Sequence, residues 1–169
     1  MDRRLLAAAY DRSAAGYDER FRELQRPKFR AAAPHLIAPP DSLCLDAGGG
    51  TALFQEWAQE EKPGLLAARW LVIDLSLGML LVARGRAALV VAADLARPPL
   101  RPASCALVCA FTSLLDEVPR ALRELAALVQ PGGRLVVSFL RAEAPRSLPL
   151  RVAAEIDAGQ DRVFVLRKD

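Results

Sequence analysis

From about residue 40 onward, short apolar runs alternate with longer amphipathic segments, and this alternation restricts the fold more than any other feature. Five runs are almost wholly apolar, as expected of strands covered on both faces: 43–46, 71–74, 88–92, 106–110 and 134–140. Helices are expected between them, over 51–61, 76–84 and 119–129. Strands that alternate with helices predict a parallel sheet flanked by helices, which is an α/β fold.

The two ends of the chain add to this arrangement. Residues 3–37 have an amphipathic, helical pattern, and the positions expected to be buried are Leu5, Leu6, Tyr10, Tyr17, Phe21, Leu24 and Phe29. Gly132 and Gly133 are expected to end the helix over 119–129. The runs 150–156 and 162–166 predict a closing β-hairpin, although the first run could instead form a helix.

The length of 169 residues fits one globular domain, and a hydrophobic fraction of 53% is too high for a disordered chain. The longest apolar runs are far shorter than the roughly 20 residues that a membrane-spanning helix needs. The apolar patch near the amino terminus is also too short for a secretory signal. We therefore expect a cytoplasmic protein that makes no contact with a membrane.

Cysteine content and charge exclude some further classes. The three cysteines, Cys44, Cys105 and Cys109, lie in apolar runs beside a single histidine, so we expect neither a disulfide framework nor a metal site. The net charge of +3 is divided into +3 over residues 1–38, −3 over 39–94 and +3 over 95–169. Basic ends suit an anionic partner such as RNA, although solvated arginines on helix faces are the simpler explanation.

The segment with the most specific information is 43–53, where a strand leads through Gly48-Gly49-Gly50 into a helix. Glycines at the carboxyl end of a strand let the backbone approach a ligand closely. Asp46 precedes these glycines, Asp74 ends the second strand and Asp94 follows the third, so three strand ends in order present a carboxylate. Such carboxylates suit hydrogen bonds to a nucleoside, and Asp74 is expected to accept from ribose hydroxyls.

The spacing of the glycines separates two classes of nucleotide site. A dinucleotide fingerprint requires a third glycine at position 53, which is leucine. The order Asp46, Gly48, Gly50 instead resembles the first motif of class I S-adenosylmethionine-dependent methyltransferases. Five further segments resemble that family in the same order: 10–18, 72–80, 93–95, 107–113 and 121–135. The resemblance is to the small enzymes of the ubiquinone/menaquinone-pathway type.

This resemblance implies a Rossmann-like, doubly wound, mostly parallel sheet of seven strands with a carboxyl-terminal antiparallel hairpin. It implies a methyltransferase domain over 39–169 and a helical segment over 1–38 that caps the cofactor and substrate side. The implied cofactor is S-adenosyl-L-methionine, with S-adenosyl-L-homocysteine as product.

Carried over by position, the resemblance implies a set of cofactor-binding residues along the strand ends. They are Tyr17, Asp46, Gly48, Gly49, Gly50, Asp74, Leu75, Met79, Asp94, Leu95 and Phe111. Gly48 and Gly50 would lie under the methionine moiety, and Asp94 would accept from the adenine amine. The sequence departs from the family in three places: Ala52 replaces a glycine, Cys105-Ala106 stands where an acidic residue is common before the fourth strand, and Leu114 with Leu115 replaces a polar pair.

No histidine is available as a general base near these motifs. The candidates for proton removal are Asp116, Glu117 and Tyr17, although the first two could equally be charges that favour the start of the next helix. Because a sulfonium methyl is already activated, positioning of the acceptor and exclusion of water can supply most of the catalysis.

The acceptor is the least defined part of the prediction. Only 29 residues follow Leu140, which leaves little chain for a lid. An open site suits a macromolecular acceptor, and we expect RNA, with a small molecule as the alternative. A partner protein that completes the site, or a non-catalytic S-adenosylmethionine-binding subunit, is a further possibility. A nicotinamide-dependent oxidoreductase is the last alternative.

Overall fold

The computed structural model describes residues 3–87 and 89–169. Its strands are β1 (Leu43–Ala47), β2 (Arg69–Asp74), β3 (Leu89–Ala92), β4 (Cys105–Phe111), β5 (Val129–Leu140), β6 (Arg151–Ala158) and β7 (Asp161–Arg167). The helices are α1 (Arg3–Ala32), α2 (Leu53–Glu61), α3 (Leu77–Ala83) and α4 (Val118–Leu128). Three short 3₁₀ turns add η1 (Ala33–His35), η2 (Pro63–Ala67) and η3 (Arg141–Glu143).

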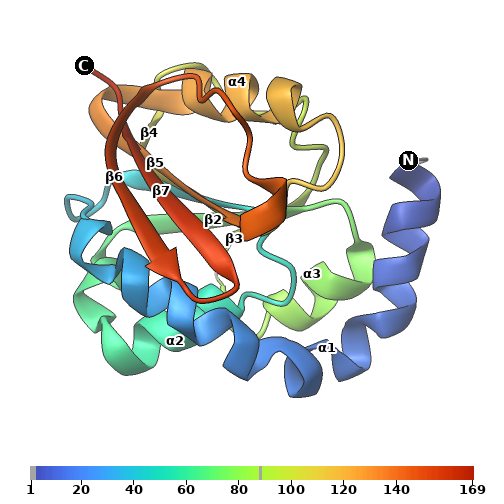
Figure 1. The fold of residues 1–169 in the computed structure, drawn as a ribbon. Coiled ribbons are helices and arrows are strands. Elements are labelled where there is room, and N and C mark those ends of the chain that lie inside the picture. Colours follow the sequence, from blue (N-terminus) through green and yellow to red (C-terminus); the bar gives the residue numbers. More distant parts are fainter. Residues whose placement is uncertain (1–2, 88) are drawn as a thin grey trace.

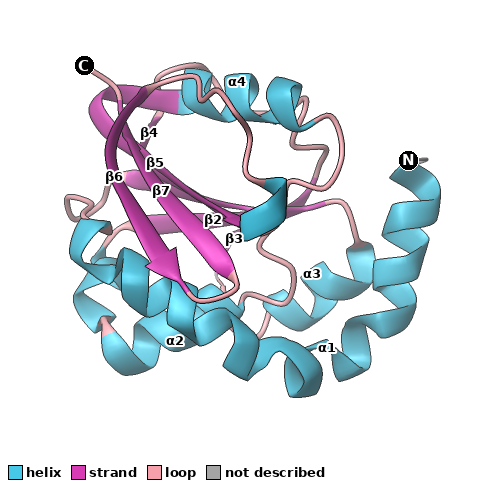
Figure 2. Ribbon diagram, in the orientation of Figure 1, coloured by secondary structure: helices cyan, strands magenta, loops and turns pink. Residues whose placement is uncertain are grey.

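The strands form one seven-stranded sheet in the order β3-β2-β1-β4-β5-β7-β6. β1 to β5 pair in parallel, and β7 pairs antiparallel with β5 and with β6. Helices α1, α2 and α3 cover one face and α4 covers the other (Figure 1, Figure 2). The predicted doubly wound fold with a closing hairpin is confirmed, including β6 as a strand rather than a helix.

β1 lies at the point where the strand order reverses, because β2 follows it on one side and β4 on the other. In open α/β sheets the crevice at the carboxyl ends of such strands is the place where ligands bind. The Gly48–Gly50 turn follows β1 directly, so the topology puts the glycines at this crevice. Of the helices that the structure describes, none is both long and apolar enough to cross a membrane.

Each face of the sheet has its own apolar core. On the α4 face, Leu122 and Leu125 pack with buried side chains of β4, β5 and β7. On the other face an aromatic group joins α1 and α2 to the sheet, with Phe29 and Phe111 ring centroids 5.0 Å apart. Edge-to-face aromatic pairs of this kind add to the free energy of burial. The carboxyl-terminal half of α1 is therefore fixed against β4.

A buried charged network also fixes α1 to the sheet. Lys28 Nζ lies 2.8 Å from an Asp161 carboxylate oxygen, and both side chains are at most 7% exposed. The same ammonium donates to Thr112 Oγ1 at 2.6 Å, and that oxygen lies 3.0 Å from Ser138 Oγ. Thr112 has a φ of 50°, which is unfavourable for a β-branched residue. The network thus holds the end of β4 in a strained conformation beside α1.

Exposed ion pairs join α1 to α2, and we call this surface the paired face. Arg22 lies 2.7 Å from Glu56, Arg26 lies 2.6 Å from Glu60, and Arg30 lies 2.7 Å from Glu61. Arg86, at the end of α3, adds contacts to Asp18 at 2.5 Å and to Glu56 at 2.9 Å.

Two sequence predictions about these elements are wrong. Gly132 and Gly133 do not end the helix: α4 ends at Leu128, and both glycines lie within β5. Pro131 disfavours a helical conformation at the residue before it. The Gly132 N–H donates to Lys168 O, just after the end of β7, so this segment pairs with the carboxyl-terminal strand.

The second wrong prediction concerns α1, where Leu5 and Leu24 are 67% and 55% exposed. α1 buries only part of the predicted stripe, because its two halves pack on different elements, α3 and then α2 with β6 and β7. Ala88, the first residue of the predicted strand 88–92, and residues 1–2 of the predicted segment 1–38 lie outside the described residues.

Candidate functional site

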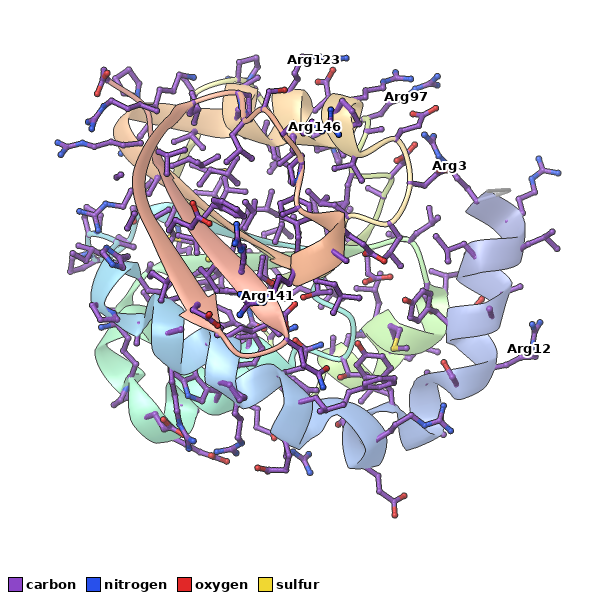
Figure 3. The ribbon with its side chains drawn as sticks, in the orientation of Figure 1. Arg3, Arg12, Arg97, Arg123, Arg141 and Arg146 are labelled. Atoms are coloured by element: carbon purple, nitrogen blue, oxygen red, sulfur yellow. The ribbon has the colours of Figure 1, made fainter. Side chains whose placement is uncertain are left out.

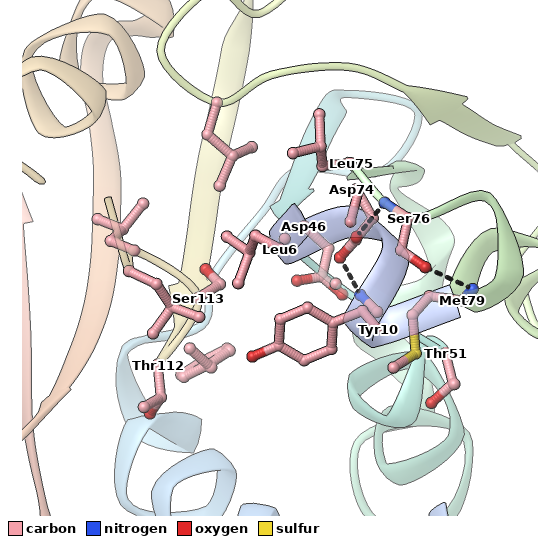
Figure 4. A pocket seen from close by; sticks show the side chains of 18 of the residues that line it. Leu6, Tyr10, Asp46, Thr51, Asp74, Leu75, Ser76, Met79, Thr112 and Ser113 are labelled. Carbon is pink, nitrogen blue, oxygen red and sulfur yellow. Dashed lines mark hydrogen bonds between the residues drawn. The ribbon is translucent and has the colours of Figure 1, made fainter. Parts of the chain in front are cut away.

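A pocket lies at the carboxyl ends of β1, β2 and β4, with α1 forming its outer wall (Figure 4). All eleven predicted cofactor residues line it: Tyr17, Asp46, Gly48, Gly49, Gly50, Asp74, Leu75, Met79, Asp94, Leu95 and Phe111. Phe111 is 7% exposed. The sequence motifs, which are spread over some ninety residues, therefore converge on one site.

The turn after β1 explains why glycine is required there. Gly48 has a φ of 67°, and a Cβ at this position would lie 2.4 Å from the Cβ of Ser113. Gly50 has a φ of 56° and no neighbouring atom within 4 Å of such a Cβ, so its backbone faces open space in the pocket. Ala52, where the family has glycine, takes the same left-handed region with a φ of 63°. The turn therefore adopts the left-handed conformation at this position with alanine in place of the third glycine.

Asp46 lies beneath this turn and is 2% exposed. Its Oδ2 atom has no hydrogen-bond partner among the described residues, and a Cβ on Gly49 would lie 2.5 Å from that oxygen. Burial raises the pKa of Asp46 to about 7. A buried carboxylate oxygen without a donor is costly, and it indicates a place for a ligand that donates hydrogen bonds or carries positive charge.

Asp74 at the end of β2 is held by backbone amides. Its Oδ2 accepts from Gly50 N at 3.0 Å and its Oδ1 accepts from Ser76 N at 2.8 Å. Burial raises the pKa of Asp74. Ser76 caps α3, as predicted, by accepting from Met79 N at 3.1 Å (Figure 4). Each oxygen of Asp74 keeps a second lone pair for a ligand in the pocket.

Asp94 lies at the other end of the pocket, next to Leu95. Its Oδ1 accepts from Ala96 N at 2.9 Å, and its Oδ2 accepts from the guanidinium of Arg3. The same guanidinium contacts Glu117 and lies 4.0 Å from Asp116. One arginine of α1 thus joins the loop after β3 to the loop after β4.

The wall from α1 brings in side chains that the sequence motifs did not indicate as ligand groups. Tyr10, Gln25 and Phe29 line the pocket together with Tyr17, and Gln25 Oε1 has no hydrogen-bond partner among the described residues. Burial raises the pKa of Tyr17 to about 12, so its hydroxyl keeps its proton at neutral pH. Residues 10, 17 and 25 are spaced so that they lie on one face of a helix, and this spacing was the sequence signal that could have placed them together.

The three candidates for proton removal do not meet at one point. Asp116 lines the pocket near Arg3, whereas Glu117 contacts Arg3 from outside the lining and forms the N-cap position of α4 with a φ of 46°. Thr112 and Ser113, which the sequence did not single out, lie between Phe111 and these acids and line the pocket. Ser113 Oγ donates to Ala47 O at 2.6 Å. The end of β4 is therefore polar but carries no histidine.

The pocket fits S-adenosylmethionine in three separate respects. Gly50 leaves room for a ligand against the backbone, Asp46 offers an unpaired carboxylate oxygen, and Asp74 presents a fixed carboxylate at the strand end where ribose hydroxyls bind in such folds. Within the described part of the chain, no group of three metal-ligating side chains could hold a metal ion.

Comparison with solved structures supports the fold. A structure of an S-adenosyl-L-methionine-dependent methyltransferase from Methanococcus maripaludis superposes with a TM-score of 0.73, at 14% identity, over 94% of this chain and 93% of that one. The methyltransferase in a complex with the Trm112 methyltransferase activator of Haloferax volcanii gives a TM-score of 0.67 at 19% identity, over 77% of this chain and 59% of that one.

Comparison at the sequence level is more specific. The malonyl-[acyl-carrier protein] O-methyltransferase of Serratia marcescens is 32% identical over 155 residues, which are 88% of this chain and 57% of that protein. The enzyme of the same name from Pectobacterium atrosepticum is 33% identical over 82% of this chain and 53% of that protein. The chain thus spans little more than half the length of these curated relatives.

The family described as "Methyltransferase domain" matches residues 45–137, from the middle of β1 into β5. This match includes the glycine turn, Asp74 and Asp94. The fold of the chain agrees with it, because solved methyltransferase structures superpose on the chain. The predicted resemblance is confirmed: the chain belongs to the family of S-adenosylmethionine-dependent methyltransferases.

Proposed function

We propose that this chain transfers a methyl group from S-adenosylmethionine to a carboxylate oxygen of an acyl group bound to an acyl carrier protein, with the malonyl group as the first candidate. Two curated relatives carry the name of that activity. The observation that carries the proposal is that the three predicted candidates for proton removal, Asp116, Glu117 and Tyr17, either lie against the Arg3 guanidinium or keep their own proton.

Each candidate base is engaged or protonated. Tyr17 keeps its proton because burial raises its pKa to about 12. Asp94 accepts from Arg3, and Asp116 lies 4.0 Å from the same guanidinium. Asp74 is bound by two backbone amides. A carboxylate acceptor is already ionised at neutral pH and requires no base, unlike an alcohol.

In the proposed complex the chain's own residues bind and orient the cofactor. Asp74 accepts from the ribose hydroxyls, Asp94 and Leu95 contact the adenine, and Leu75 and Met79 pack against its ring. Gly48, Gly49 and Gly50 lie against the methionine part, whose ammonium would supply the donor that Asp46 Oδ2 lacks. When bound, the cofactor would supply a methyl group on a positively charged sulfur. A carboxylate oxygen would bond to that carbon as the carbon–sulfur bond breaks, which leaves neutral S-adenosylhomocysteine and requires no proton transfer.

We assign the acceptor to the side of the pocket between α1 and the end of β4. Tyr10, Tyr17 and Gln25 of α1 line the pocket together with Phe111 and Thr112 from the end of β4. Residues 1–38 then act as a cap that excludes water from the methyl group and narrows the approach of the acceptor. The hydroxyl and amide groups there can donate to one carboxylate oxygen and leave the other free to react.

The test is methyl transfer from radiolabelled S-adenosylmethionine to malonyl-acyl carrier protein, with free carrier protein as control. We expect a base-labile methyl ester on the malonyl carrier only. Calorimetry with S-adenosylhomocysteine measures cofactor binding separately. Tight binding of S-adenosylhomocysteine without methylation of the malonyl carrier contradicts the proposed acceptor but not the cofactor.

RNA is the second candidate acceptor, favoured by exposed arginines beside the pocket. The same labelled cofactor incubated with total RNA tests it, and label in RNA but not in the malonyl carrier would reverse the order of the two candidates. One structural neighbour is a methyltransferase in complex with an activator. A protein that binds cofactor but methylates neither substrate alone would accordingly be tested as the binding subunit of a complex.

A further inference from the structure

Three exposed arginines on the α4 side of the molecule have no acidic partner among the described residues. They are Arg97 after β3, Arg123 on α4 and Arg146 between η3 and β6, and we call them the arginine arc (Figure 3). On the paired face, by contrast, Arg22, Arg26, Arg30 and Arg86 all contact carboxylates. Among residues 3–87 and 89–169, therefore, no carboxylate forms an ion pair with an arginine of the arc.

The arc lies beside the mouth of the pocket. Arg97 belongs to the turn that Asp94 opens, and its N–H donates to Asp94 O at 2.9 Å. Arg3, which bonds to Asp94 from α1, lines the pocket. Figure 3 shows Arg97, Arg123 and Arg146 around α4, Arg3 nearby at the start of α1, and Arg12 further away on α1. A partner that binds the arc therefore reaches the site at the Arg97 end.

A second groove includes Arg146 and has a mixed polar and apolar lining. Leu148, Leu150 and Phe164 line it together with charged side chains, which are Arg141, Arg146, Glu155 and Arg162. At the mouth of the pocket Leu115 is 41% exposed. Basic side chains around apolar patches are typical of surfaces that bind an acidic protein, because charge steers the approach and apolar contact supports the complex.

We propose that the arginine arc is the docking surface for an acidic carrier protein that presents its acyl group to the pocket. This rests on the proposed function, because the acyl group is the acceptor assigned there. The arc holds no exposed aromatic side chain on which bases could stack, whereas sites for single-stranded RNA combine basic grooves with such side chains. The net charge of +3 is also small for a surface that follows a nucleic acid backbone.

The experiment compares two substrates with the same reacting group. One is malonyl-acyl carrier protein, and the other is the malonyl thioester of N-acetylcysteamine, which has no protein part. The variants are Arg97→Glu, Arg123→Glu and Arg146→Glu, singly and combined. Arg12→Glu, on the outer side of α1, matches each single reversal in charge and exposure. Affinity for S-adenosylhomocysteine and the far-UV circular dichroism spectrum report whether each variant is folded.

We expect the triple variant to lower kcat/KM for the malonyl carrier about tenfold or more and to leave the small thioester within twofold of wild type. Added salt should lower the wild-type value for the carrier towards that of the variant, since exposed charges are screened. Arg12→Glu should change neither substrate. Equal loss on both substrates, or no loss on the carrier, overturns the docking surface.

Binding of the carrier protein alone, by fluorescence anisotropy, separates docking from chemistry. If wild type methylates neither substrate yet binds the carrier through the arc, the proposed acceptor fails and the docking surface stands. If wild type methylates the carrier and the triple variant does so equally well, the acceptor stands and the docking surface fails. Loss of RNA binding in the triple variant, with carrier binding unchanged, also overturns the proposal and assigns the arc to RNA.

Discussion

The paired face and the arginine arc are both rich in arginine, but only the arginines of the paired face form ion pairs among the described residues. On the paired face, arginines of α1 contact carboxylates of α2, and Arg86 joins the same group of charges. On the arc, the arginines extend from loops and from α4 and form no ion pair with a carboxylate of the described residues. The number of arginines therefore says little about function, and the position of their partners says much.

A third position, the buried pair of Lys28 and Asp161, marks the limit of this comparison. Surface ion pairs contribute little to stability, because water and salt screen them. A buried pair is different, since each charge depends on the other for its solvation. The ties between α1 and the rest of the molecule therefore range from the exposed pairs of Arg22 and Arg26 to a pair that is nearly inaccessible.

The largest effect is expected from Lys28→Met. It leaves the Asp161 carboxylate buried without its counter-charge and removes the donor to Thr112. We expect a loss of about 3–5 kcal/mol in the free energy of unfolding, measured by urea denaturation. The double variant Lys28→Met with Asp161→Leu should recover much of that loss, because no unpaired charge remains. A loss below about 1 kcal/mol in the single variant would show that the pair is not a structural tie.

A pH effect of the pocket comes next. The folded-state pKa of Asp46 is about 7, above its ordinary value of 3.8. The folded protein therefore holds this proton more tightly than the unfolded chain does, so the stability that it contributes is complete below pH 3.8 and is lost as the pH rises through 7. The unfolding free energy without cofactor should fall over this range, and Asp46→Asn should remove that part of the slope. Equal slopes in both proteins would contradict the shift.

Much of this pocket could be predicted from sequence because its signals are local. Asp46 and the three glycines lie within five residues between a strand and a helix, and Asp74 ends a strand, so the fold class alone brings them together. Tyr10 could be predicted only as a buried helical position, and Arg3 and Gln25 were not predicted at all, since nothing near them in the sequence specifies which surface α1 will cover. The acidic partners of the arginines depend on how α1 packs against α2 and α3, so they could not be predicted from the sequence either.

Gly48→Ala tests the part of the pocket that sequence predicted best. A methyl group there would meet the Cβ of Ser113 at 2.4 Å, at a φ of 67° that alanine disfavours. We expect the affinity for S-adenosylhomocysteine to fall about tenfold or more, which corresponds to about 1.4 kcal/mol. Gly64→Ala is the matched control, because its Cβ meets no atom within 4 Å and its φ is not positive. Unchanged affinity in Gly48→Ala would remove the turn from the proposed cofactor site.

Arg86→Gln is expected to weaken the ion pairs of the paired face. Among the arginines of this face, only Arg26 is less exposed than Arg86. The guanidinium is 21% exposed and contacts Asp18 and Glu56, which also belong to the network around Arg22. We expect a loss of about 1 kcal/mol in the free energy of unfolding, at the upper end for a surface pair because several charges share the contact. The loss should shrink in 0.5 M salt, and a loss independent of salt would indicate packing rather than charge.

The smallest effect is expected from Arg123→Gln on the arc, and it decides whether the two regions truly differ. Arg123 is exposed on α4 with no ion pair among the described residues, so its replacement removes no ion pair there. We expect the free energy of unfolding to stay within about 0.5 kcal/mol of wild type in urea denaturation. Because Gln and Arg both suit a helix, the change leaves helix propensity nearly constant. A loss equal to that of Arg86→Gln would mean that the arc stabilises the fold, and its arginines would then carry no argument for a partner.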